Sequence, residues 1–101
     1  MIDPANAEPA VQAASGDVTV RYWASARAAA GVDSETFAVS GPTPLSDLLA
    51  RAKGPRDRRF ADVVGCCSVM VGDRPVTTED PSAVLVQPGS TVELLPPFAG
   101  G

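Results

Sequence analysis

The sequence predicts one small α+β domain in which a main helix packs across one face of a mixed β-sheet. Apolar and polar residues alternate near the start of the domain, over residues 18–23, and again at its end, over Thr91–Leu95. This period of two is typical of half-buried strands. Between these segments, apolar residues recur at the spacing of one helical face: Leu45, Leu48, Leu49 and Ala52. A chain of 101 residues is long enough for a single modest hydrophobic core.

The first part of the domain is predicted to form a strand, a short helix and a second strand. Three alternate residues of the first strand should face the core: Val18, Val20 and Tyr22. Residues 24–30 are rich in alanine and are followed by Gly31, so we expect one or two helical turns there. Residues 36–40 alternate again, which predicts a second strand that can form a hairpin with the first.

The main helix is predicted over residues 43–53. Thr43 is a good N-cap residue and Pro44 suits the first helical position. The apolar stripe of this helix should pack across the sheet. A short second helical segment is predicted from the spacing of three apolar residues: Phe60, Val63 and Val64. The charged residues of the stretch that begins at Arg56 are interpreted as a solvated face.

The remaining segments are predicted to complete the sheet. Residues 67–71 should form a strand and residues 74–77 a short edge strand, with a turn at Gly72 between them. An irregular segment begins at Asp80, and Pro88-Gly89 should form a turn before the last strand. The last strand, Thr91–Leu95, is apolar enough to be a central one. Two of its residues should face the core: Val92 and Leu94.

Residues 1–16 are rich in alanine and proline, and they carry Asp3 and Glu8 where an export signal would carry basic residues. We therefore expect a disordered N-terminal extension over residues 1–16 and a folded domain over residues 17–101. No uninterrupted apolar run approaches the ~20 residues that cross a bilayer, so no membrane-spanning segment is expected.

The composition argues against several classes of function. The net charge is −4 and the only basic cluster is formed by Arg56, Arg58 and Arg59, which argues against nucleic-acid binding. The sequence has no histidine, no glycine-rich phosphate loop and no zinc-ligand spacing. We therefore expect no metal site and no catalytic constellation within the chain itself.

The two cysteines, Cys66 and Cys67, are adjacent and lead into an apolar run. We interpret them as part of a buried strand, and the alternative is an exposed redox-active thiol. Two cysteines that are not part of a disulfide framework favour a reducing compartment, the cytoplasm.

The residues after the last strand suggest a presented arm. Pro96 and Pro97 cannot extend a central strand, so they should project as a stiff segment that carries Phe98. Gly100 and Gly101 have no side chains and can pass through a narrow channel. The terminal carboxylate would then be the reactive group. The alternative is a frayed end of small residues.

Trp23 alternates with the core residues of the first strand and should point out of the other face of the sheet. A large aromatic residue there indicates either a partner surface or local packing against a loop. Leu95 points the same way as Trp23 only if the first and last strands are in register.

The order of these elements and four motifs resemble the MoaD/ThiS family of ubiquitin-like β-grasp sulfur carriers, and MoaD more closely. The resemblance covers residues 18–101. The motifs are Val20-Arg21-Tyr22-Trp23-Ala24 followed by Arg27 and Gly31, the helix start at residues 43–49, Pro88-Gly89-Ser90-Thr91-Val92, and Leu94-Leu95-Pro96-Pro97-Phe98-Ala99-Gly100-Gly101. The last motif is the most specific, because Gly-Gly follows Pro-Pro at the end of the closing strand.

The resemblance implies a sulfur carrier that forms the small subunit of molybdopterin synthase. An E1-like adenylating enzyme would use ATP and magnesium to convert the carboxylate of Gly101 to an acyl-adenylate. A sulfur donor such as a cysteine desulfurase or a rhodanese would then replace AMP and leave a thiocarboxylate. ATP and magnesium would be used by that enzyme, and no cofactor is expected to stay bound to the carrier.

The resemblance also implies how the carrier meets its partner, a MoaE-like large synthase subunit, in a heterotetramer. Four tail residues would enter the active site of that subunit: Pro97, Phe98, Ala99 and Gly100. Three others would face it: Trp23, Leu95 and Arg27. This sequence departs from the family in its N-terminal extension, in Trp23 where phenylalanine is more usual, and in the Cys66-Cys67 pair.

Two other functions would use the same activated Gly101. One is sulfur transfer for another product, such as the thiamin thiazole or cysteine, and the other is a ubiquitin-like modifier that is joined to lysines. The pattern around Arg27 and the two prolines before Phe98 favour the molybdopterin role.

Overall fold

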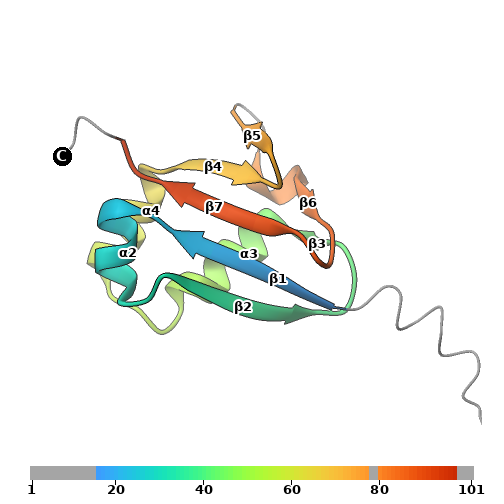
Figure 1. The fold of residues 1–101 in the computed structure, drawn as a ribbon, viewed down its shortest axis with the longest axis horizontal. Helices are drawn as coiled ribbons and strands as arrows, with labels where there is room; N and C mark the ends of the chain where they lie inside the picture. Colours follow the sequence, from blue (N-terminus) through green and yellow to red (C-terminus); the bar gives the residue numbers. More distant parts are fainter. Residues whose placement is uncertain (1–15, 78–79, 98–101) are drawn as a thin grey trace, which may run out of the picture.

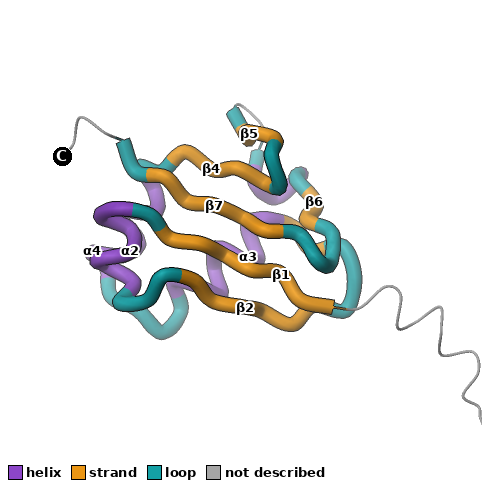
Figure 2. The backbone as a smooth tube through the Cα atoms, viewed as in Figure 1, coloured by secondary structure: helices purple, strands orange, loops and turns teal. Residues whose placement is uncertain are grey.

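The computed structural model describes residues 16–77 and 80–97, in which a curved sheet is covered by helices on one face (Figures 1 and 2). The strands are β1 (Gly16–Tyr22), β2 (Ser34–Val39), β3 (Thr43–Pro44), β4 (Ser68–Val71), β5 (Arg74–Val76), β6 (Leu85–Val86) and β7 (Thr91–Leu95). The helices are α2 (Ala24–Ala30), α3 (Leu45–Lys53), α4 (Arg58–Gly65) and the single 3-10 turn η1 (Pro81–Ala83).

The main sheet has five strands in the order β2-β1-β7-β4-β5, and β3 pairs with β6 in a separate two-stranded ladder. The first and last strands, β1 and β7, lie side by side and run parallel. The other neighbours in the main sheet are antiparallel. The α+β class, the mixed sheet and the central position of the last strand are therefore confirmed. The helices α2, α3 and α4 correspond to the short helix, the main helix and the second helical segment that the sequence predicts.

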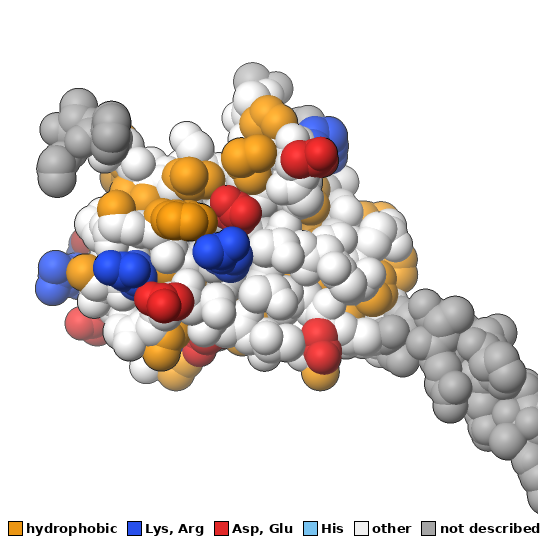
Figure 3. Space-filling view, in the orientation of Figure 1, with side chains coloured by type: hydrophobic (Ala, Val, Ile, Leu, Met, Phe, Trp, Pro, Cys, Tyr) orange, Lys and Arg blue, Asp and Glu red, His pale blue; other side chains and the backbone are white. Residues whose placement is uncertain are grey.

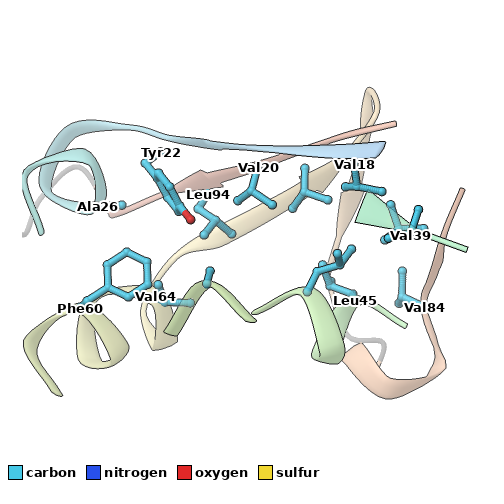
Figure 4. Packing of buried hydrophobic residues seen from close by; sticks show 14 residues of the cluster. Val18, Val20, Tyr22, Ala26, Val39, Leu45, Phe60, Val64, Val84 and Leu94 are labelled. Atoms are coloured by element: carbon cyan, nitrogen blue, oxygen red, sulfur yellow. The ribbon is translucent and has the colours of Figure 1, made fainter. Parts of the chain in front are cut away.

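The core lies between the sheet and the helices, where the buried side chains of both layers meet (Figure 4). The predicted inward residues of the two central strands are all buried: Val18, Val20, Tyr22, Val92 and Leu94. Leu45, Leu48 and Ala52 of α3 are buried as predicted, and Leu49 is only half-buried. In α4, Phe60 and Val64 are buried. The alternating and helical patterns of the sequence therefore identified the core.

The start of the main helix differs from the prediction. Thr43 and Pro44 form β3, which pairs with Val86 and Leu85 of β6, and α3 begins only at Leu45. The Thr43 hydroxyl donates a hydrogen bond to the carbonyl oxygen of Gly41 at 2.9 Å and does not cap the helix. Local propensity favoured a helix start at Thr43, but pairing with a strand more than forty residues away satisfies this backbone instead.

The segment from Asp80 is also more regular than expected. The carboxylate of Asp80 accepts hydrogen bonds from the backbone N–H and the hydroxyl of Ser82, which nucleates η1. Strand β6 follows and buries Val86 against the core. The predicted turns are confirmed, since Gly72 and Gly89 have φ values of 64° and 90°, which favour glycine.

Arg56 does not belong to a solvated face, because its side chain is only 13% exposed. Its guanidinium lies 2.8 Å from Oε1 of Glu35 and also donates hydrogen bonds to the carbonyl oxygens of Ala30 and Ala52. It lies over the rings of Tyr22 and Phe60, at 5.5 and 5.0 Å from their centroids. Arg56 therefore joins the ends of α2 and α3 to β1, β2 and α4.

Tyr22, Glu35 and Arg56 form one cluster, because the Tyr22 phenol also donates a hydrogen bond to Oε1 of Glu35, at 2.6 Å. Burial alone would raise the pKa of Glu35, but the hydrogen bonds from Arg56 and Tyr22 outweigh it and hold that pKa below its ordinary value. Burial, and then the bond to Glu35, raise the pKa of Tyr22. Glu35 is therefore ionised and Tyr22 neutral at physiological pH.

No helix in the part of the chain that the structure describes is long and apolar enough to cross a membrane.

Leu48→Ala should lower the free energy of unfolding by about 2–5 kcal/mol, because it removes a side chain with no solvent exposure and leaves a cavity. Urea unfolding followed by circular dichroism would measure this. The matched control is Leu85→Ala, since Leu85 is 55% exposed and its truncation should change stability little. Equal midpoints for the two variants would contradict the assignment of Leu48 to the core.

The stability of the chain should fall in acid through Glu35. Because the folded pKa lies below the ordinary value of 4.5, the contribution of this group is complete above that value and is lost as the pH falls through the folded pKa. Glu35→Gln should therefore be less stable at neutral pH and lose less stability on acidification. Unfolding curves from neutral pH to about pH 3 would test this. The control is Asp33→Asn, which removes a carboxylate that is 84% exposed, and a parallel acid response of all three proteins would contradict the prediction.

Candidate functional site

The parallel register of β1 and β7 places Trp23 and Leu95 on the same side of the sheet. Tyr22 is opposite Leu94 in this ladder, and both side chains are buried toward the helices. The next residue after each of them, Trp23 and Leu95, therefore faces away from the helices. Trp23 keeps an extended backbone, and its N–H donates to the carbonyl oxygen of Leu94 at 3.2 Å. The first and last strands are therefore in register, and Leu95 points the same way as Trp23.

No helix of the described residues covers this outer side of the sheet (Figure 1), which carries an apolar patch near the end of β7 (Figure 3). Ladder pairing places Met70 of β4 beside Glu93, and Pro75 of β5 beside Met70. Trp23 is 40% exposed, Pro75 is exposed, and Leu95 and Met70 are half-buried. We call the surface formed by Trp23, Leu95, Met70 and Pro75 the open-face patch. Its apolar side chains and their partial exposure suit a surface that a partner covers.

Two charged residues adjoin the open-face patch. Arg21 precedes Trp23 by two residues on β1, and Glu93 precedes Leu95 by two residues on β7. The guanidinium carbon of Arg21 lies 4.8 Å from the centroid of the Trp23 ring, which is a cation–π contact. This contact restrains the indole on the outer face without burying it.

The backbone turns sharply directly after Trp23. Ala24 has a φ of 48°, the only positive value outside glycine among the described residues. The left-handed region costs an L-residue roughly 1–2 kcal/mol, and such strain is often found at functional sites. The carbonyl oxygen of Trp23 accepts hydrogen bonds from the N–H groups of Ala26 and Arg27, so it starts α2 without a side-chain cap. Trp23 is therefore fixed at the junction of a strand and a helix.

Arg27 lies in the last turn of α2 and is exposed. Its closest charged neighbour is Asp33, at 3.5 Å, and both side chains are mostly in solvent, so this pair contributes little to stability. The guanidinium is free to meet a partner, and its place in an interface stays a prediction.

The arm begins at the end of the central strand. Pro96 is half-buried and Pro97 is exposed, and neither continues the ladder. β7 ends at the same end of the sheet as β1 and α2, next to the open-face patch (Figure 1). The remaining predicted tail residues lie outside the described residues: Phe98, Ala99, Gly100 and Gly101.

The cysteines do not belong to a buried strand. Cys66 is exposed at the end of α4, Cys67 is half-buried before β4 begins, and both are free. The thiol of Cys67 donates a hydrogen bond to the carbonyl oxygen of Val63 at 3.3 Å. Burial, and then the nearby Cys66, raise the pKa of Cys67 to about 11, so its thiol stays protonated. Helix α4 runs to Gly65, so the strand begins later than the apolar run suggested.

Among the residues that the structure describes, no three His, Cys, Asp or Glu side chains are grouped as metal ligands would be.

Sequence reasoning assigned no role to Arg21, Met70 and Glu93. Their outward direction follows from the period-two pattern of β1, β4 and β7. That Met70 and Glu93 lie side by side depends on the pairing of β4 with β7, which no local pattern reveals.

No protein-family model matches the sequence. A curated relative is the molybdopterin synthase sulfur carrier subunit of Aspergillus niger, which is 29% identical over 82 residues. The match covers 81% of this chain and 91% of the relative.

Three similar solved structures support the fold. A putative molybdopterin converting factor subunit 1 from Pyrococcus furiosus has a TM-score of 0.66 and 24% identity, over 82% of this chain and 99% of its own. Small archaeal modifier protein 1 from Haloferax volcanii has a TM-score of 0.68 and 19% identity, over 85% and 100%. A chain from the complex of subunits 1 and 2 of the Helicobacter pylori 26695 molybdopterin-converting factor has a TM-score of 0.56 and 21% identity, over 84% and 99%. The fold is the ubiquitin-like β-grasp.

Trp23→Ala should leave the free protein folded. It removes an exposed ring and a cation–π contact, so the free energy of unfolding should fall by no more than about 1 kcal/mol. Tyr22→Ala is the matched control, because Tyr22 is 2% exposed and packs edge-on against Phe60. Its loss should cost about 3–5 kcal/mol. Urea unfolding of both variants decides the matter, and a Trp23→Ala protein as unstable as Tyr22→Ala would make Trp23 a core residue.

Proposed function

We propose that this chain, a ubiquitin-like sulfur carrier of the MoaD/ThiS type, serves as the small subunit of a molybdopterin synthase. One observation carries the proposal: the central strand β7 ends beside the exposed open-face patch and continues into Pro96 and Pro97, after which the sequence reads Phe-Ala-Gly-Gly. The name of the Aspergillus niger relative and the names of the Pyrococcus furiosus and Helicobacter pylori proteins support the same role.

The proposal assigns separate tasks to the rigid sheet and to the tail. The open-face patch docks on the large subunit, and the central strand fixes the point from which the arm starts. Prolines 96 and 97 keep the arm extended, so that little conformational entropy is lost when it enters a partner. Glycine at the end removes side chains that would block a narrow active site.

The chemistry takes place on the carboxylate of Gly101. A carboxylate is a poor electrophile, because its oxygen is a poor leaving group. A separate E1-like adenylating enzyme, with ATP and magnesium, forms the acyl-adenylate and releases pyrophosphate. The persulfide of a sulfur donor such as a cysteine desulfurase or a rhodanese then attacks the acyl-adenylate and releases AMP, and a thiol reductant cleaves the resulting acyl disulfide and is itself oxidised to a disulfide. The product is a thiocarboxylate, and the described part of the carrier contributes no catalytic group to either step.

The thiocarboxylate then enters the active site of a MoaE-like large subunit and donates its sulfur to the pterin precursor of the dithiolene. The Helicobacter pylori complex supports a partner of this kind, because it joins subunits 1 and 2 of a molybdopterin-converting factor. Trp23, Leu95 and Arg27 face the partner in this arrangement. A heterotetramer of two small and two large subunits is the assembly that we propose.

A second candidate function is that of a ubiquitin-like protein modifier. It is favoured by the similarity to small archaeal modifier protein 1, whose structure matches this chain with a TM-score of 0.68. Sulfur transfer for the thiamin thiazole or for cysteine is a third use of the same fold. All of these functions need an activated Gly101, and they differ in the acceptor, so conjugates on lysine would identify the modifier.

Gly101 should be the residue that acquires sulfur. The full chain is incubated with the adenylating enzyme, ATP, magnesium and a sulfur donor, and its intact mass is measured before and after. We expect the mass change of one oxygen replaced by sulfur, located on the C-terminal peptide. The starting mass also tests whether Gly101 ends the mature chain.

Two variants serve as matched controls for this reaction. Deletion of Gly101 withdraws the carboxylate by roughly 3.3–3.6 Å, and one added residue converts the Gly101 carbonyl to an ordinary amide, so neither should acquire sulfur. Both should melt like the parent. Sulfur on the truncated chain, or on Cys66 or Cys67, would overturn the proposal.

A further inference from the structure

Glu93 is an acidic residue in the middle of the outer face of the sheet. It lies on the central strand β7, opposite Arg21 of β1 in one ladder and opposite Met70 of β4 in the other. It is half-buried. Within the described ranges its carboxylate forms no hydrogen bond and no ion pair.

The nearest candidate cation on the same face is engaged elsewhere. Arg21 is the residue opposite Glu93, but no ion pair joins the two side chains in the structure as described. Its guanidinium instead lies 4.8 Å from the centroid of the Trp23 ring. Among the described residues, the face therefore presents a cation that lies over an aromatic ring and a separate carboxylate that forms no ion pair.

This arrangement limits what can cover the open-face patch. Two half-buried apolar side chains, Leu95 and Met70, lie within two positions of Glu93 on the same side of the sheet. A protein that covers them also removes water from the carboxylate. An ionised carboxylate that is buried without a partner destabilises a complex strongly, whereas one that meets a cation contributes to specificity.

We propose that the open-face patch binds a protein surface that combines an apolar pocket for Trp23 and Leu95 with a basic side chain that pairs with Glu93. The occupant to which we assign this surface is the large synthase subunit, so the inference rests on the proposed function. Glu93 then acts as a specificity determinant, because a partner surface that lacks the cation would leave a buried charge unpaired.

The test measures the Kd of the full chain for the large synthase subunit of the same organism by titration calorimetry. Glu93→Gln removes the charge with little change of shape and should raise the Kd about tenfold or more. Glu93→Lys places a cation against the partner's cation and should raise it about a hundredfold. The matched control is Asp17→Asn, which removes the same charge from the far end of the same face and should leave the Kd unchanged.

A double-mutant cycle separates a cation of the partner from Arg21. If Glu93 pairs with the partner, Glu93→Gln has the same effect in the parent and in Arg21→Gln, and the Kd of the Glu93→Gln chain is less sensitive to salt than that of the parent. If docking moves Arg21 onto Glu93, the effect disappears in the Arg21→Gln background. That result would overturn the inference.

Three other results would also test the role of Glu93. Unchanged binding by both Glu93 variants, with weakened binding by Trp23→Ala, would overturn the inference but leave the proposed docking intact. Unchanged binding by all three would remove the docking surface and with it that part of the proposed function. Self-association of the free chain that Glu93→Gln abolishes, seen by sedimentation, would assign the face to a second copy of the chain and would also overturn the inference.

Discussion

The parallel pairing of β1 with β7 is the constraint on which the rest of the structure depends. These strands come from opposite ends of the domain sequence and form the centre of the sheet. Their register aligns Val20 with Val92 and Tyr22 with Leu94, which places all four side chains in one core. A shift of one residue would exchange the buried and exposed faces of the strand. The same register brings Trp23 next to Leu95 and starts the arm at the end of a strand that is held on both sides.

The cluster of Tyr22, Glu35 and Arg56 connects this central pair to the helices. Tyr22 is the last residue of β1, and Glu35 lies on the neighbouring edge strand. Arg56 bonds to Glu35 and to carbonyl oxygens at the ends of α2 and α3. Helix carbonyls at these ends have no partners within their own helices, so the guanidinium satisfies acceptors that would otherwise be unpaired. The cluster thus holds the end of β1, and with it the position of Trp23, against the helical layer.

The two faces of the sheet therefore have different physical roles. The inner face is apolar and closed by α3 and α4, and its residues determine stability. The outer face combines an apolar patch with Arg21 and Glu93, and neither charge is required by the core. A strained backbone at Ala24 is retained directly beside this patch. Such a combination indicates selection for recognition rather than for stability alone.

The sequence by itself determined the elements whose patterns are local. The alternation in β1 and β7, the helical spacing from Leu45 to Ala52 and the turn at Gly89 were all predicted, because each follows from the backbone geometry of one segment. The Pro-Pro-Phe-Ala-Gly-Gly motif was likewise evident from residue chemistry alone.

Only the tertiary structure decided the features that depend on partners distant in the chain. Thr43 and Pro44 joined a strand instead of a helix because β6 offers them hydrogen bonds. Arg56 became part of a half-buried ion pair because Glu35, 21 residues earlier, meets it across the fold. Met70, Arg21 and Glu93 became neighbours through two strand ladders. Local propensities differ by only about 1 kcal/mol per residue, so long-range pairing and burial decide wherever the two conflict.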